Sequence, residues 1–119
     1  MTEKTYQGGC HCGAVRYEAE LDLSGMLIVC NCSHCEKMGF ILAFTPLEKF
    51  RLVSGENALT EYRFYKHQIA HRFCSVCGAQ AFAQGVMPDG AEVTAINVRC
   101  IDGIDLASLE PQQFDGRSL

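Results

Sequence analysis

The segment Cys74-Ser75-Val76-Cys77-Gly78 has the form of a zinc knuckle, in which two thiolates grip one ion from a tight turn. Gly78 supplies the left-handed backbone that such turns favour, which lets backbone N–H groups point at sulfur. A site with four cysteines needs two more thiolates. The segment Cys10-His11-Cys12 is the natural donor, because alternate side chains of an extended segment lie on one side and His11 points away. These cysteines predict a structural zinc that closes a loop of about 60 residues.

The eight cysteines could in principle form disulfides, bind metal or carry out redox chemistry. The N-terminus lacks the apolar stretch of a secretory signal, so we expect a reducing, cytoplasmic location where disulfides do not persist. The cysteines also fall in tight clusters, which favours metal. A thioredoxin-like C-x-x-C opens a helix in a βαβ unit, whereas Cys74 and Cys77 lie in a β context with Gly78 directly after them. Metal binding is therefore the preferred interpretation.

A second cluster, Cys30-Asn31-Cys32-Ser33-His34-Cys35, offers three thiolates in one short segment. Three protein ligands and an open position are the arrangement of a catalytic zinc. The alternative is a closed site that takes a fourth ligand from elsewhere. The candidates for that ligand are His34, His67, His71 and Cys100, and Cys100 is also interpreted as a buried, inert thiol. Three thiolates lower the Lewis acidity of zinc, so the cluster suits a soft substrate thiol better than hydroxide.

Composition limits the remaining possibilities. The 119 residues are the size of one domain, predicted over 1–119, and the hydrophobic fraction of 48% predicts a folded chain. The net charge is −4 and no basic cluster is present, which argues against partners such as nucleic acid or an anionic membrane surface. No apolar run is long enough to predict a membrane span. The oligomeric state is left open.

The hydrophobic pattern predicts a mostly β fold. Ala14–Leu21 and Leu59–Tyr65 alternate apolar and polar residues, as half-buried strands do. Further strands are expected at Met26–Val29, Phe40–Phe44, Phe50–Val53, Ile69–Phe73, Ala79–Ala83 and Val93–Val98. Short helical turns are expected at His34–Met38, Pro46–Phe50 and Leu106–Leu109. The result is a single all-β domain of several short antiparallel sheets stapled by zinc.

Three motifs occur in a characteristic order. They are C-x-C-G-x-V-R-Y at Cys10–Tyr17, C-x-C-x-x-C-x-K-x-G at Cys30–Gly39, and R-F-C-x-x-C-G-x-x-x-F at Arg72–Phe82. The sequence resembles the glutathione-dependent formaldehyde-activating enzyme family, which also contains proteins similar to centromere protein V. The likeness extends through Leu59–Tyr62 and Asn97–Gly103.

The resemblance implies a fold of coiled antiparallel β-sheets, shared with small zinc-binding chaperones of Rab GTPases. It implies two zinc ions, with full occupancy of the second left open. The structural ligands would be Cys10, Cys12, Cys74 and Cys77, and the catalytic ligands Cys30, Cys32 and Cys35. The implied activity is that of a carbon–sulfur lyase, which joins the thiol glutathione and the aldehyde formaldehyde to form S-hydroxymethylglutathione.

The segment from Tyr65 to His71 departs from the family pattern, in which small hydroxyl residues are common there, and the loops between Val53 and Arg72 are short. Because loops carry specificity, the thiol is predicted only as glutathione or a similar small thiol. Lys37 and Arg72 are candidates to bind its carboxylates, or are ordinary solvated charges. His34 is either a supporting group or proton shuttle beside the ligands, or an exposed bystander. The alternative function is a zinc-stapled binding or thiol-sensing module without turnover.

Overall fold

Short β-strands account for most of the regular structure. The computed structural model describes residues 3–63, 69–87 and 89–116. The strands are β1 (Lys4–Gly9), β2 (Arg16–Leu21), β3 (Leu27–Cys30), β4 (Leu42–Pro46), β5 (Phe50–Ser54), β6 (Leu59–Tyr62), β7 (Ile69–Cys74), β8 (Phe82–Val86), β9 (Glu92–Asn97) and β10 (Gln112–Phe114). The helical elements are α1 (Ser33–Met38) and the single 3₁₀ turns η1 (Leu47–Lys49), η2 (Glu56–Ala58), η3 (Val98–Cys100) and η4 (Leu106–Ser108).

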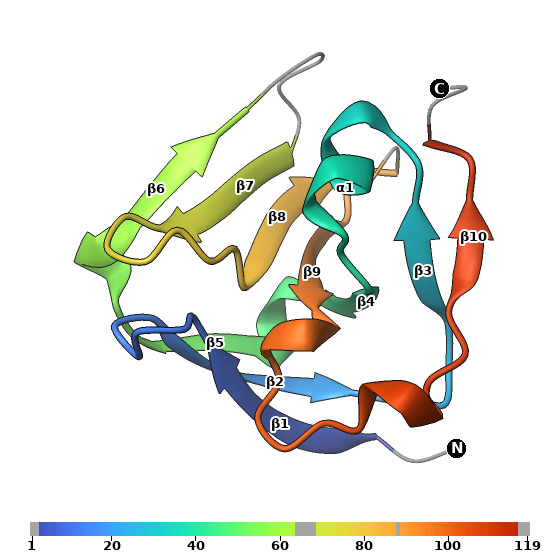
Figure 1. Cartoon of the computed structure of the whole chain (residues 1–119), viewed down its shortest axis with the longest axis horizontal. Coiled ribbons are helices and arrows are strands. Elements are labelled where there is room, and N and C mark those ends of the chain that lie inside the picture. The colour runs from blue at the N-terminus through green and yellow to red at the C-terminus, as the bar shows by residue number, and fades with distance from the viewer. Residues whose placement is uncertain (1–2, 64–68, 88, 117–119) are drawn as a thin grey trace.

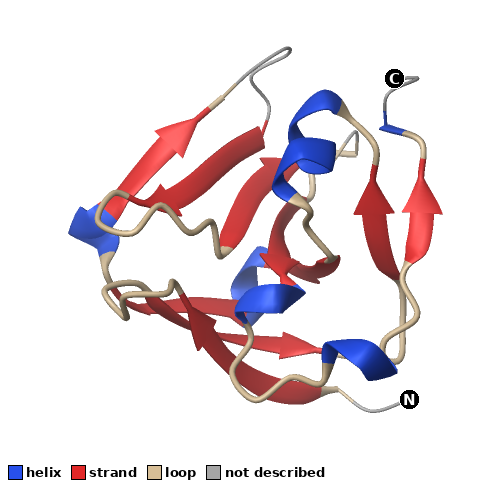
Figure 2. Ribbon diagram, in the orientation of Figure 1, coloured by secondary structure: helices blue, strands red, loops and turns tan. Residues whose placement is uncertain are grey.

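The strands form two sheets (Figures 1 and 2). A three-stranded sheet has the order β1-β2-β5, and a seven-stranded sheet has the order β10-β3-β4-β9-β8-β7-β6. Figure 1 shows the larger sheet curving around α1, with the smaller sheet across its base. The predicted mostly β class with antiparallel pairing is confirmed, with the exception that β10 pairs with β3 in parallel.

The core lies between the two sheets. Along β2, Tyr17, Ala19 and Leu21 are buried while the residues between them are more exposed, which is the alternation that the sequence predicts. The Tyr17 ring packs against Phe50 and Phe82, with ring centroids 5.5 and 6.3 Å away. Full burial of one such side chain is worth about 1.5–3 kcal/mol. The contact between Tyr17 of β2 and Phe82 of β8 holds the small sheet on the large one.

The helix α1 depends on its surroundings and its caps. Its six residues are too few to form a stable helix alone. The Cys32 side chain caps its N-terminus by accepting a hydrogen bond from the Cys35 N–H, 3.3 Å away. Gly39, at φ 72°, ends it in the left-handed conformation and donates to the Cys35 carbonyl oxygen. The expected turn at His34–Met38 is confirmed, and it begins one residue earlier.

Two strands have no counterpart in the sequence prediction. The β1 strand begins with polar residues and ends in two buried glycines, so it lacks an alternating apolar pattern, and its pairing with β2 supplies its stability. The β10 strand is a short exposed edge with the sequence Gln-Gln-Phe. The strands expected at Phe40–Phe44 and Ala79–Ala83 begin two or three residues later than predicted. The end of the strand expected to reach Tyr65 falls partly outside the described residues.

Candidate metal centres

The first centre joins the end of β1 to the turn after β7. The sulfur atoms of Cys10, Cys12, Cys74 and Cys77 lie within 4.8 Å of one another. The Cys12 sulfur is 3.6 Å from that of Cys10 and 3.7 Å from that of Cys74. Thiolates bound tetrahedrally to zinc at about 2.3 Å are about 3.8 Å apart, so this arrangement fits one zinc ion. The Val15 N–H adds a hydrogen bond to the Cys10 sulfur at 3.2 Å.

Backbone amides support the knuckle turn. The Val76 N–H donates to the Cys74 sulfur at 3.4 Å, and Gly78 has the expected left-handed conformation at φ 82°. Hydrogen bonds from the backbone N–H groups of Ala79 and then of Cys12 lower the pKa of Cys77 to about 6. These donors favour the thiolate, which is the form that binds metal.

The second centre is contained between the end of β3 and the first turn of α1. The sulfur atoms of Cys30, Cys32 and Cys35 also lie within 4.8 Å of one another. The Cys32 N–H donates to the Cys30 sulfur at 3.4 Å. Burial, followed by the neighbouring sulfurs, raises the pKa of Cys35. Metal binding here must therefore release a proton.

No fourth ligand completes this group among residues 3–63, 69–87 and 89–116. The structure places His34, His71 and Cys100 outside the cluster, and His67 lies outside the described residues. Cys100 is half-buried among core residues, and burial raises its pKa to about 11. It therefore remains a protonated thiol at neutral pH. His11 is exposed and is not part of the four-cysteine group.

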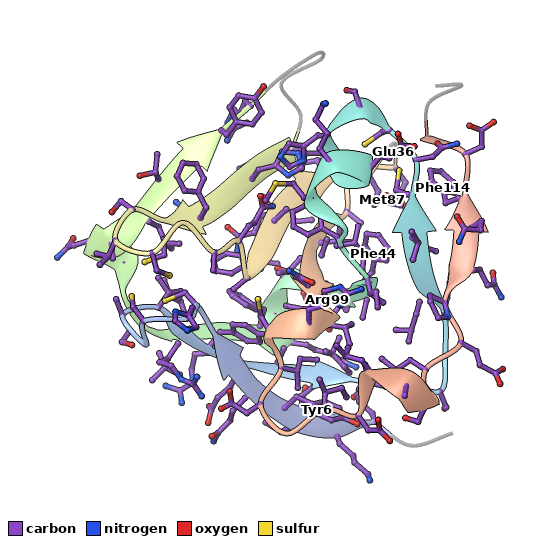
Figure 3. The ribbon with its side chains drawn as sticks, viewed as in Figure 1. Tyr6, Glu36, Phe44, Met87, Arg99 and Phe114 are labelled. Carbon is purple, nitrogen blue, oxygen red and sulfur yellow. The ribbon has the colours of Figure 1, made fainter. Side chains whose placement is uncertain are left out.

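The C-terminal strand lies directly beside the three-cysteine cluster, a feature that the sequence did not predict. In the parallel β10–β3 pairing, Phe114 is opposite Cys30. The Asn31 side-chain nitrogen donates to the Asp115 carboxylate at 3.0 Å. A Cβ atom on Gly116 would lie only 2.5 Å from the Cys30 sulfur, so any other residue here would force the segment or the Cys30 side chain to shift. Figure 3 shows Phe114 on the same side of the molecule as Glu36 of α1.

A group of rings borders α1. The His34 ring centroid is 4.2 Å from that of His71 and 5.7 Å from those of Phe40 and Tyr62. The Gln80 side-chain nitrogen is 3.1 Å from Nδ1 of His71, within hydrogen-bond distance. Desolvation and then the neighbouring His34 lower the pKa of His71 to about 4. His71 is therefore neutral at pH 7. His34 is half-buried.

The two candidate carboxylate-binding residues differ in their surroundings. Lys37 is exposed on α1. Arg72 is half-buried, with Nε 3.7 Å from a carboxylate oxygen of Glu61. A third cation, Arg99 (labelled in Figure 3), donates from Nε to the Gly39 carbonyl oxygen at 3.0 Å and so fastens the C-terminus of α1.

The fold and the two clusters define a class of small β-sheet proteins with two cysteine centres spaced to bind metal. The family model for glutathione-dependent formaldehyde-activating enzymes matches residues 5–115, and the chain belongs to that family. A crystal structure of a Rhodobacter sphaeroides protein is similar, with 34% sequence identity and a TM-score of 0.82. That match covers 91% of this chain and 99% of the other. Among the described residues, no helix has the length and apolar character needed to cross a membrane.

Proposed function

We propose that the protein is a zinc-dependent carbon–sulfur lyase that joins a small thiol, glutathione or similar, to formaldehyde and also releases it. The observation that carries this proposal is the cluster of Cys30, Cys32 and Cys35, which has three sulfurs close together and no fourth ligand among the described residues. Family membership supports a formaldehyde- and glutathione-related function in general.

The donor set suits zinc at both centres. The spacing of Cys10, Cys12 and Cys74 is that of thiolates around one tetrahedral ion, and this centre has the structural role in the proposal. Bound by Cys30, Cys32 and Cys35, zinc would supply a soft Lewis acid that favours the thiolate form of the cosubstrate.

The remaining contribution of the chain is position and exclusion of water. Phe40 and Leu42 pack against the three cysteines and give one side of the cluster an apolar wall. In the reaction a bond forms between the thiol sulfur and the aldehyde carbon, the carbonyl π bond breaks, and the thiol proton ends on the former carbonyl oxygen. Holding the two reactants together removes most of the entropic barrier to such an addition.

The direct test is exchange between formaldehyde and its S-hydroxymethyl adduct, followed by two-dimensional exchange NMR. The wild-type protein should accelerate this exchange with glutathione, and Cys35→Ser should abolish the acceleration while the fold remains intact. Cys100→Ser is the matched control, because Cys100 belongs to neither cluster. Suppose that no thiol at millimolar concentration changes the exchange or the spectrum of cobalt-substituted protein. The enzyme proposal would then fail in favour of a binding or thiol-sensing module.

The proposal also includes a cytoplasmic location, one domain over residues 1–119 and no nucleic-acid partner. The last point rests on the net charge of −4 and the lack of a basic cluster in the sequence. Gel-shift titration with a duplex DNA should show no binding at physiological salt. Micromolar binding with a steep salt dependence would contradict it.

A further inference from the structure

A cavity of about 240 Å³ opens between α1, the strands β6 and β7, and the knuckle turn. The residues that line it are His34, Met38, Tyr62, Phe73, Gly78 and Gln80. His34 and Met38 are one turn apart on α1 and so share a face of the helix. The volume is below that of a cavity for a drug-sized ligand and suits a group of about the size of one ring.

The lining is neutral and aromatic. The rings of His34 and Tyr62 are stacked, with an interplanar angle of 29°. Met38 adds a thioether, a group that makes favourable contacts with aromatic rings. Gln80 contributes a side-chain amide to the lining, and the nitrogen of that amide lies 3.1 Å from Nδ1 of His71. The described residues that line this cavity include no aspartate, glutamate, lysine or arginine.

This lining does not match either of the two substrates for which the family is named. Glutathione carries two carboxylates, which require cationic partners. Lys37 is exposed outside the cavity lining, and Arg72 lies against the Glu61 carboxylate. Formaldehyde has no side group that could occupy a cavity. The cavity therefore suits some other, uncharged part of a substrate.

The cavity adjoins the three-cysteine cluster through α1. His34, which forms part of its wall, lies between Cys32 and Cys35 in the chain. Phe40 contacts the cysteine cluster on one side and approaches the His34 ring to 5.7 Å on the other. Phe40 therefore contacts both the cysteine cluster and a ring of the cavity wall, which makes the cavity and the cluster neighbours in the fold.

We propose that this cavity binds a neutral aromatic ring carried by the thiol or the aldehyde that reacts at the three-cysteine centre. The assignment of the ring to a reacting molecule rests on the proposed lyase function. Stacking on Tyr62 and contact with His34 and Met38 would hold the ring, and its substituent would reach the cysteines.

Binding is tested first with benzyl alcohol, which carries a ring but cannot form the adduct. Titration into the zinc-loaded protein should shift the NMR signals of the Gln80 side-chain amide and the His34 ring. Tyr62→Leu should weaken binding about tenfold, since it removes one stacking partner. Phe44→Leu is the matched control, because it also replaces an exposed aromatic ring but lies outside the cavity lining, and it should leave binding unchanged. Equal effects of the two variants, absence of binding, or preferential binding of tetramethylammonium would overturn the proposal.

A second measurement distinguishes the two sources of the ring. The first comparison uses exchange NMR with 2-mercaptoethanol as the thiol and either benzaldehyde or butyraldehyde as the aldehyde. The second uses formaldehyde as the aldehyde and either benzyl mercaptan or glutathione as the thiol. The ring-bearing member of one pair should react about tenfold faster in the wild type, and Tyr62→Leu should remove that advantage. If glutathione and formaldehyde exchange as fast as any pair and Tyr62→Leu has no effect, the ring site is overturned and the lyase proposal stands. If benzyl alcohol binds at the cavity and the protein accelerates the exchange of no pair, the ring site stands and the lyase proposal fails.

Discussion

The two cysteine centres have similar ligands, but one joins distant segments of the chain and the other lies within a single short segment. The four-cysteine centre joins segments 62 positions apart, and Cys12 within it is exposed. The three-cysteine centre takes all its sulfurs from the short segment Cys30–Cys35, and Cys30 and Cys35 are buried. The strand β10 pairs with β3 along one side of this centre. A metal at the first centre would act as a cross-link, whereas a metal at the second would bind to a preformed local loop. Loss of metal should therefore have different consequences at the two centres.

The largest effect is expected from Cys77→Ala. The binding free energy of a structural zinc is about 10–16 kcal/mol, which is as large as the whole stability of a typical domain. The variant should be unfolded or insoluble at neutral pH, as measured by circular dichroism and thermal unfolding. Cys100→Ala is the control and should stay folded. A Cys77→Ala protein with two bound zinc ions and normal thermal stability would show that this centre is not structural.

Stepwise removal of zinc should separate the two centres. A chromogenic chelator should first withdraw one ion without any change in circular dichroism, because the three-cysteine centre holds no distant segments together through its sulfurs. The second ion should leave only as the protein unfolds. The Cys35→Ser protein should contain one zinc ion, and that ion should leave only as the protein unfolds. Release of both ions in one step with unfolding would contradict the division of roles.

A smaller, local effect is expected from Gly116→Val. The new Cβ would lie 2.5 Å from the Cys30 sulfur, so either the C-terminal segment or the cysteine must move. Overpacking of this kind costs about 1–3 kcal/mol. We expect at least tenfold weaker zinc binding at the three-cysteine centre, measured by competition with a chelator, and a melting temperature lowered by roughly 3–15 °C, which is a far smaller loss than that of Cys77→Ala. Gln112→Ala, an exposed change in β10 itself, is the control. Two tightly bound zinc ions in Gly116→Val would show that the segment after β10 does not constrain the centre.

The smallest effect is expected from Asp102→Asn. Arg16, at the start of β2, donates a hydrogen bond at 3.2 Å to the Asp102 carboxylate and also forms an ion pair with it, which lowers the pKa of Asp102. Because the folded-state pKa is the lower one, the stabilisation is present above the unfolded-state pKa and is lost only as pH falls through the folded-state value.

Both groups are partly exposed, with 34% of the Arg16 side chain and 55% of the Asp102 side chain accessible, so the effect should be below about 1 kcal/mol. Urea unfolding of the wild type and of Asp102→Asn should show the same small difference at pH 7 and pH 5, and a smaller one in 1 M salt. A difference that grows with salt would indicate a cause other than this ion pair.

The sequence was most informative where geometry is local. The spacing of Cys74 and Cys77 with Gly78 predicted a left-handed turn with N–H groups directed at sulfur, and the structure contains it. The alternating pattern of Ala14–Leu21 predicted β2 for the same reason, since side chains two apart share a face. Prediction failed at β1 and β10, where the residues show no periodic apolar pattern and pairing with a neighbouring strand supplies the order.

The sequence alone determined which cysteines cluster and the class of the fold, because ligand spacing and period-2 alternation are fixed by the geometry of a few adjacent residues. Only the tertiary structure decided what surrounds those clusters. It set Gly116 against Cys30, and it brought His34, Tyr62 and His71 together from three separate elements. These contacts depend on the order of strands in the large sheet, and strand order leaves no pattern in any short stretch of sequence.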